Sequence, residues 1–247
     1  MQRRHRIILA TLAISAATGH VAAAAMPPVD VAIVLLSDVS RSIDDSEFNL
    51  EKNGYASAFN AQVIAAIQNG PLGRIAVAYV EFAGADQVRT VVAWSVIDSE
   101  PSARNFAAAL VAAPRSFYGR TAIGSGIEQA ARLLNDPALT STRTVIDVAG
   151  DGTSNAGVSV TEARDAAIEA GITINGLAII NDHPVSYTFA HTQPPGGLAQ
   201  WYRDNVSGGP ASFVLEVHDF QTFGQAMSRK LLSEIAMARP VRFGANR

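Results

Sequence analysis

The chain has 247 residues, 48% of them hydrophobic and 17% charged, a composition that can bury a sizeable core and excludes a disordered protein. It has no cysteine, which excludes a disulfide-stapled scaffold and a lipid-modified N-terminal cysteine. The formal charge of −3 and the lack of basic runs after residue 6 argue against a nucleic-acid binder.

The first 25 residues have the order of a secretory signal peptide. Three arginines between residues 3 and 6 precede a mostly apolar run from Ile7 to Ala17, and small residues follow. The run is shorter than the roughly 20 residues that span a bilayer, so cleavage near Ala24 or Ala25 is predicted instead of a permanent anchor. Loss of the segment changes the formal charge to about −6, and the mature protein is expected in the periplasm or outside the cell.

Continuous apolar runs of strand length indicate strands that are buried on both faces of a parallel sheet. They lie at residues 31–36, 75–82, 144–149 and 172–180. A further candidate, residues 88–96, follows the second run so closely that the two are predicted to pair antiparallel. A last strand is expected at residues 212–217.

Helical stretches alternate with these strands, at residues 44–68, 101–113, 123–134, 160–170 and 220–238. The alternation predicts an α/β fold with a doubly wound, mostly parallel sheet and helices on both faces. Residues 26–240 are expected to form a single domain, followed by a tail at residues 241–247. Residues 181–209 interrupt the pattern and predict a long surface loop, with helical turns around residues 198–205.

Oxygen-bearing side chains follow two of the predicted strands and precede one predicted helix. They are Asp38, Ser40 and Ser42 in "SDVSRS", Thr121 in "YGRTAIGSG" and Asp151 in "GDGTSN". Because the carboxyl ends of parallel strands meet at one edge of a sheet, these five side chains can converge there. Carboxylates and hydroxyls without cysteine or histidine suit a hard cation, so a Mg²⁺ site is predicted, with Mn²⁺ or Ca²⁺ as alternatives.

The pattern Asp38-x-Ser40-x-Ser42, followed by Thr121 and Asp151 in these contexts, resembles the metal-ion-dependent adhesion site of von Willebrand factor A-type domains. The resemblance covers about residues 29–238 and implies the same doubly wound sheet, with one short antiparallel edge strand. It also implies that the five side chains hold the metal, directly or through water, and that the metal captures an acidic group of a partner protein. A binding module is therefore expected, and not an enzyme.

Four stretches, "DVSRSID", "GRTAIGSGI", "DVAGDGTSN" and "WYRDNVSGGPASFV", are similar to an uncharacterised family of secreted bacterial proteins, a domain of unknown function. That similarity implies no activity of its own. Two residues depart from the wider A-type pattern. Arg41 stands where glycine is common, and Ser37 stands where an apolar residue often precedes the aspartate.

Two other interpretations of the first motif stay open at the level of the sequence. Asp38, Ser40 and Ser42 could satisfy backbone groups in a turn, which would leave a structural protein with an inactive metal site. Ser40 or Ser42 could instead be the nucleophile of a hydrolase, if Asp182 and His183 supplied the base.

A partner-binding surface is suggested by Trp201, Tyr202 and Arg203, because aromatic residues and arginine are enriched at binding hot spots. Arg41 joins them as a candidate; it either points outward or adds positive charge beside the metal. The alternative is that the residues at 201–203 pack the long loop against the sheet.

Overall fold

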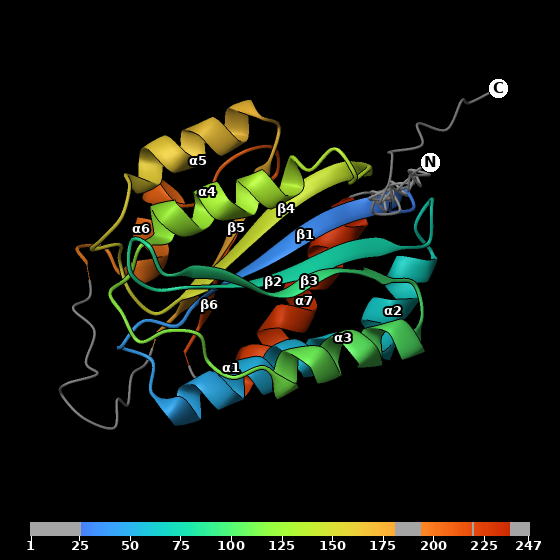
Figure 1. Cartoon of the computed structure of the whole chain (residues 1–247), viewed down its shortest axis with the longest axis horizontal. Helices are drawn as coiled ribbons and strands as arrows, with labels where there is room; N and C mark the ends of the chain where they lie inside the picture. Colours follow the sequence, from blue (N-terminus) through green and yellow to red (C-terminus); the bar gives the residue numbers. More distant parts are fainter. Residues whose placement is uncertain (1–25, 181–193, 219, 238–247) are drawn as a thin grey trace, which may run out of the picture.

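A six-stranded sheet forms the centre of the computed structural model, which describes residues 26–180, 194–218 and 220–237. The strand order is β3-β2-β1-β4-β5-β6, and β3 pairs antiparallel with β2 while the other neighbours are parallel (Figure 1). The strands are β1 (Val29–Asp38), β2 (Ile75–Phe82), β3 (Val88–Ile97), β4 (Ser141–Gly150), β5 (Thr173–Ile179) and β6 (Val214–Val217). The predicted α/β fold and the antiparallel pair are confirmed, with β3 ten residues long.

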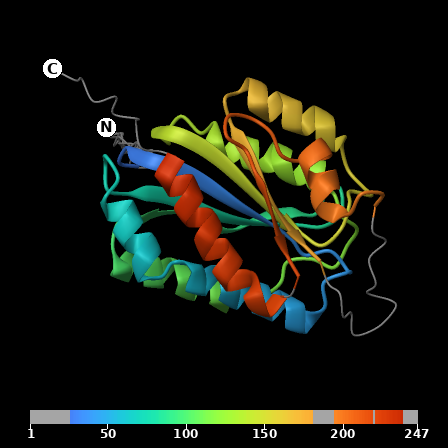
Figure 2. The same cartoon turned by 180° about the vertical axis from the view of Figure 1, so that it is seen from behind.

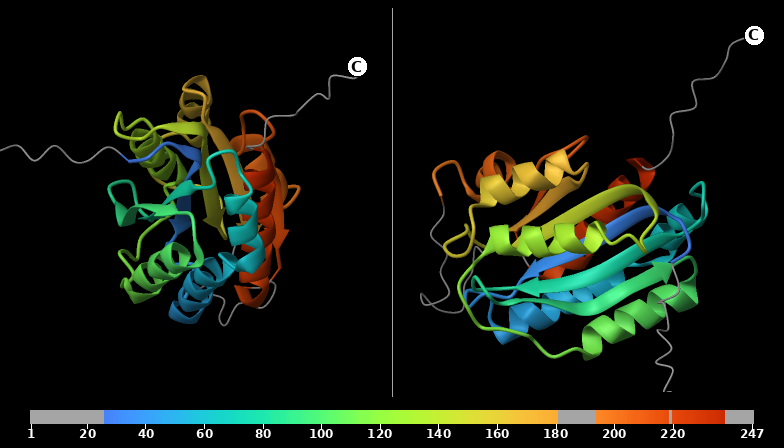
Figure 3. Two further views of the ribbon diagram at one scale, coloured as in Figure 1. Left: turned by 90° about the vertical axis from the view of Figure 1, so that its right-hand side faces the viewer. Right: turned by 45° about the horizontal axis from the view of Figure 1, so that its top comes forward.

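Helices cover both faces of the sheet (Figures 1 and 2). One face is covered by α1 (Asp45–Ala58), α2 (Ala61–Gln68), α3 (Glu100–Ala112) and α7 (Phe223–Met237). The other is covered by α4 (Ile123–Leu134), α5 (Val160–Glu169) and α6 (Leu198–Asn205), and Figure 3 shows α4 and α5 lying over the strands. Every residue of β1 is buried, because its side chains alternate between the two helical layers.

The first helical stretch is two helices, so the prediction of one helix over residues 44–68 is wrong in the middle. The side chain of Asn60 accepts hydrogen bonds from the backbone N–H groups of Gln62 and Val63, which caps a new helix after α1 has ended. The start of α1 is a capping box in which Asp44 and Glu47 satisfy each other's backbone N–H groups.

The topology places β1 beside β4 at the centre of the sheet, where the strand order reverses. Ser37 pairs with Ala149 in the register of these two strands, so the chain leaves both strands at the same level and the same edge. Ligands of doubly wound sheets bind in the crevice at this point. The fold therefore brings the loop at residues 39–44 next to the loop that begins at Asp151.

The C-terminal elements are slightly shorter than predicted. The last strand begins at Val214, and the last helical stretch divides into a short 3₁₀ helix, η2 (Phe220–Thr222), and α7. None of the helices in the described residues is long and apolar enough to cross a membrane. The predicted signal peptide, residues 181–193 of the predicted long loop, and the tail at 241–247 lie outside the described residues.

Candidate metal centre

Asp38 ends β1 and is completely buried. Its Oδ1 accepts a 2.7 Å hydrogen bond from the backbone N–H of Ser40, which fixes the carboxyl group against the following loop. Its Oδ2 has no hydrogen-bond partner among the described residues. A buried carboxylate oxygen without a donor is costly, and a cation is one way to satisfy it.

A chain of short oxygen contacts links the first loop to the third. The hydroxyls of Ser40 and Ser42 lie 3.0 Å apart, and Ser42 donates a 2.8 Å hydrogen bond to Oδ1 of Asp151. Neighbouring oxygens around an octahedral Mg²⁺ with bonds of about 2.1 Å are about 3 Å apart. These two distances are therefore compatible with neighbouring ligands of one cation.

Thr121 is buried just before α4 and is held by the third loop. Its backbone N–H donates to the side chain of Asn155 at 2.9 Å, and its carbonyl accepts from the backbone N–H of Asn155 at 2.8 Å. Ser154 donates its hydroxyl to the same carbonyl at 3.1 Å. Asn155 and Ser154 thus lock the second loop to the third, so that Thr121 faces the same pocket as Ser40 and Ser42.

A pocket of about 310 Å³ opens at these loops. Its lining includes the polar side chains of Ser40, Ser42, Thr121 and Asn155 and the two arginines Arg41 and Arg120. The carboxyl groups of Asp38 and Asp151 are fully buried behind the two serines. The five predicted metal-binding residues are therefore brought together in one place.

Burial raises the pKa values of both carboxyl groups. Burial, and then the nearby Asp151, hold the pKa of Asp38 well above its ordinary range. Burial raises the pKa of Asp151 to about 7, against the opposing hydrogen bond from Ser42. A divalent cation would stabilise the ionised forms of both groups, since it would add positive charge beside them.

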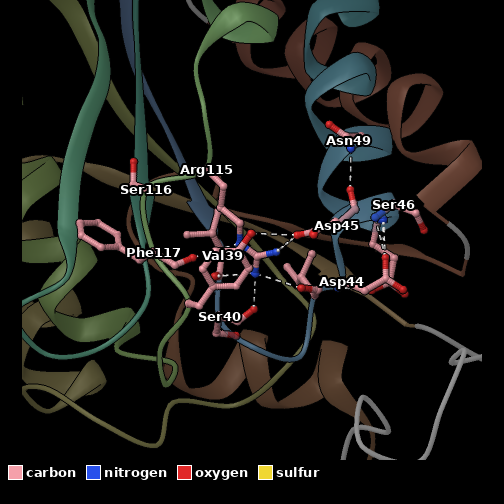
Figure 4. Close-up of polar contacts among 12 residues, drawn as sticks. Val39, Ser40, Asp44, Asp45, Ser46, Asn49, Arg115, Ser116 and Phe117 are labelled. Atoms are coloured by element: carbon pink, nitrogen blue, oxygen red, sulfur yellow. Dashed lines mark hydrogen bonds and ion pairs between the residues drawn. The ribbon is translucent and has the colours of Figure 1, made fainter.

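Arg115, from the segment between α3 and α4, organises the first loop from behind (Figure 4). Its Nη2 donates to the carbonyl oxygens of Val39 and Ser40, both at 2.8 Å, and of Ile43 at 2.9 Å, while Nε donates to that of Phe117 at 3.0 Å. Only 4% of its side chain is exposed. The guanidinium therefore fixes the backbone that carries Ser40 and Ser42.

The surroundings of Arg115 hold it in that position. Its guanidinium lies over the rings of Tyr118, at 4.2 Å from the centroid, and Phe48, at 5.3 Å. Asp45, at the start of α1, accepts from it at 3.4 Å and from the Tyr118 hydroxyl at 3.0 Å. No local motif marks Arg115 in the sequence, because its partners come from other segments of the chain.

Ser37 anchors the end of β1 on the opposite face of the sheet from Asp38. Its hydroxyl donates a 2.6 Å hydrogen bond to Oε1 of Glu51 in α1, and both residues are completely buried. Burial holds the pKa of Glu51 well above its ordinary range. The departure from an apolar residue at position 37 is thus explained by a buried hydrogen bond to a helix.

The donor set fits a hard cation. Two carboxylates and three hydroxyls are oxygen ligands of the kind that Mg²⁺ takes, often with waters completing the octahedron. In the described part of the chain, no group of three or more histidine, cysteine, aspartate and glutamate side chains is arranged to hold a metal. The candidate centre has only two carboxylates, and it depends on hydroxyl oxygens for the remainder.

The residues at 201–203 do not form one exposed surface. Tyr202 is completely buried between the sheet and α6, and Trp201 packs against the same core. Arg203 is exposed and forms an ion pair with Glu216 at 3.3 Å. The prediction of a partner-binding role is therefore wrong for Tyr202, because an inward-facing position on a short helix places it in the core.

The hydrolase alternative depends on two residues that the structure does not place. Asp182 and His183 lie outside the described residues. The hydroxyl of Ser42 donates to the carboxyl group of Asp151, and that of Ser40 contacts Ser42.

Comparison with known families gives one match over most of the chain. Residues 28–239 match the family described as "Protein of unknown function (DUF1194)". A comparison with curated proteins gives no match.

Three solved structures illustrate the similarity of the fold. Proximal thread matrix protein 1 from the mussel byssus, in a structure described as having a zinc-occupied MIDAS motif, is 19% identical with a TM-score of 0.55, over 83% of this chain and 46% of that one. BatB from Bacteroides thetaiotaomicron is 22% identical with a TM-score of 0.53, over 84% of this chain and 99% of that one. A von Willebrand factor type A structure from Catenulispora acidiphila is 16% identical with a TM-score of 0.56, over 84% of this chain and 43% of that one.

These similarities show a von Willebrand factor A-type fold. The chain spans about half the length of the mussel protein.

Proposed function

We propose that this chain, which belongs to the DUF1194 family and has a von Willebrand factor A-type fold, is a metal-dependent protein-binding module of the adhesion type. One observation carries the proposal. Five oxygen-bearing side chains on three loops converge at the point where the strand order reverses, with contacts of 2.8–3.0 Å along the chain Ser40–Ser42–Asp151.

Each of the five side chains has a part in holding the cation. Asp38 and Asp151 supply two negative charges, and Ser40, Ser42 and Thr121 supply neutral oxygens, directly or through water. When bound there, Mg²⁺ offers a coordination position to a carboxylate oxygen of a partner protein. The neutral hydroxyls matter for this role, because a third carboxylate in their place would give the centre a net negative charge, which would repel a carboxylate of the partner.

The description of the mussel protein supports the use of a divalent cation at this place in the fold, since its MIDAS motif holds zinc. For this chain we propose Mg²⁺ because the donors of the candidate centre are oxygens alone. We further propose a single domain over residues 26–240 and export to the periplasm or the exterior, with residues 1–25 as a cleaved signal peptide.

The proposal is tested by titrating the purified protein with Mg²⁺ in a calorimeter. One site is expected for the wild type, and Asp38→Asn and Asp151→Asn should each weaken binding at least about tenfold, because each removes one of the two charges. Asp165→Asn in α5 is the matched control, an exposed residue of the same type that should leave the affinity unchanged. Equal binding by all four proteins would contradict the proposal.

A further inference from the structure

The rim of the metal pocket carries two arginines. Arg41 follows Ser40 on the first loop, Arg120 precedes Thr121 on the second, and both line the pocket and are exposed. The backbone N–H of Arg41 donates to the carbonyl of Gly119 at 3.0 Å. The backbones that carry Arg41 and Arg120 are therefore next to each other at the rim. This backbone contact gives the pair a defined place beside the opening.

The side chains of this pair are available to a ligand. Among the described residues, neither guanidinium forms an ion pair with a carboxylate, and Arg120 donates one long hydrogen bond, of 3.4 Å, from Nε to Asn155. Arg115 provides the contrast, because its guanidinium is buried and bound to four backbone carbonyls. The three arginines near the site therefore divide into one that builds the loop and two that face outward.

The charges at the opening are unbalanced. Asp38 and Asp151 together would offset a divalent cation, and no carboxylate side chain lines the pocket itself. Arg41 and Arg120 would then leave two positive charges at the rim. A ligand with one carboxylate would fill the open coordination position but would leave both guanidinium groups without a partner.

We infer that the pocket selects a protein segment with two or more neighbouring carboxylates, of which one reaches the metal and the others pair with Arg41 and Arg120. Guanidinium groups form charge-assisted, often bidentate hydrogen bonds with carboxylates, which gives this rim a preference for clustered acidic side chains. The inference rests on the proposed function. It assigns Arg41 a role as a specificity-determining residue at a position where A-type domains commonly have glycine.

The test uses two blocked peptides of equal length, Gly-Gly-Asp-Gly-Gly and Gly-Asp-Asp-Asp-Gly, titrated against the full protein with saturating Mg²⁺ or with chelator. Chemical-shift changes in an NMR spectrum report binding, and the same salt concentration is kept throughout because the interaction is electrostatic. The variants are Arg41→Gln, Arg120→Gln and the double variant. Arg229→Gln in α7, an exposed arginine beside a different pocket, is the control for loss of one positive charge.

The wild type and Arg229→Gln should bind the three-aspartate peptide about tenfold more tightly than the one-aspartate peptide in Mg²⁺. The double variant should bind both peptides with similar, Mg²⁺-dependent affinity. If the wild type binds both peptides equally, or if the double variant keeps the preference, the inference is overturned while the metal-dependent function stands. Chelator-insensitive binding that still needs the two arginines would support the arginine rim and overturn the proposed function. Absence of binding to either peptide, with Mg²⁺ and with chelator alike, would overturn both.

Discussion

The hydroxyl of Ser42 donates a 2.8 Å hydrogen bond to Oδ1 of Asp151, a residue 109 positions further along the chain. The contact exists because β1 and β4 are neighbours at the centre of the sheet and end at the same level. It joins the first and third loops of the candidate metal centre. The site is thus partly preorganised, which lowers the cost of ordering its ligands when a cation binds.

Arg115→Ala should destabilise the protein by about 2–4 kcal/mol, because it removes the donor for several partly buried carbonyl oxygens of the first loop. The same loss should weaken Mg²⁺ binding, since Ser40 and Ser42 are carried by that loop. Chemical denaturation and calorimetric titration measure the two effects.

Two further variants separate loop positioning from simple loss of charge. Arg115→Lys keeps the charge but not the fork of donors, so it should recover only part of the stability and of the metal affinity. Arg104→Ala, which breaks an exposed ion pair with Glu100, should cost less than about 1 kcal/mol. A stability of Arg115→Ala equal to that of Arg104→Ala would contradict the role of Arg115.

Gly150→Ala should weaken both folding and metal binding, because a Cβ at this position would lie 2.6 Å from the hydroxyl of Tyr202 and 3.1 Å from Cβ of Asp38. Overpacking of this kind costs about 1–3 kcal/mol. Tyr202→Phe removes the hydroxyl oxygen that lies closest to the added Cβ. Combining it with Gly150→Ala should therefore restore part of the lost stability.

Tyr202→Phe alone is the informative control for that pair. The Tyr202 hydroxyl is buried and has no hydrogen-bond partner among the described residues, so its removal should leave stability unchanged or raise it. Urea unfolding of the four proteins completes the cycle. No gain in stability from adding Tyr202→Phe to Gly150→Ala would mean that the clash lies elsewhere.

Glu51→Gln should make stability less dependent on pH. Burial holds the pKa of Glu51 well above that of the unfolded chain, which is about 4.3, so the folded state keeps a proton that the unfolded state releases. At a pH below the unfolded-state pKa of about 4.3, Glu51 is protonated in both states and costs no stability. As the pH rises toward the folded pKa, the wild type loses up to about 1.4 kcal/mol per pH unit from this group.

The advantage of Glu51→Gln over the wild type should therefore be small near pH 4 and should grow toward neutral and alkaline pH. Glutamine keeps the oxygen that accepts from Ser37. Thermal unfolding measured across this pH range, with Glu169→Gln as an exposed control in α5, shows the difference. An advantage that shrinks as the pH rises would contradict a buried, protonated Glu51.

The order of elements could be predicted because the signals are local. The apolar run at residues 75–82 matches β2 and the periodic stretch at residues 123–134 matches α4 at both ends. The five candidate ligands could be grouped because they follow or precede such elements, and parallel strands end at one edge. The break between α1 and α2 could not be predicted, because Asn60 can lie within a helix or cap one, and the choice depends on the packing of the two helices against the sheet.

The supporting residues of the site could not be predicted, because their roles arise only in the folded chain. Arg115 contacts carbonyls more than 70 residues away, and carbonyl acceptors carry no signature in the sequence. Asn155 ends the sequence motif "GDGTSN", yet only the structure shows that it holds Thr121. The burial of Tyr202 could partly be predicted from the sequence, since Leu198 and Tyr202 are four residues apart on one face of a helix.

Crystals grown with Mn²⁺ in place of Mg²⁺ test the central claim most directly, because anomalous scattering locates the ion without assumptions about affinity. The expected result is one strong peak among the oxygens of Asp38, Ser40, Ser42, Thr121 and Asp151, within bonding distance or one water away, and no such peak in Asp38→Asn. A wild-type crystal with no peak at these side chains, or with its strongest peak at another part of the molecule, would contradict the assignment of this metal centre.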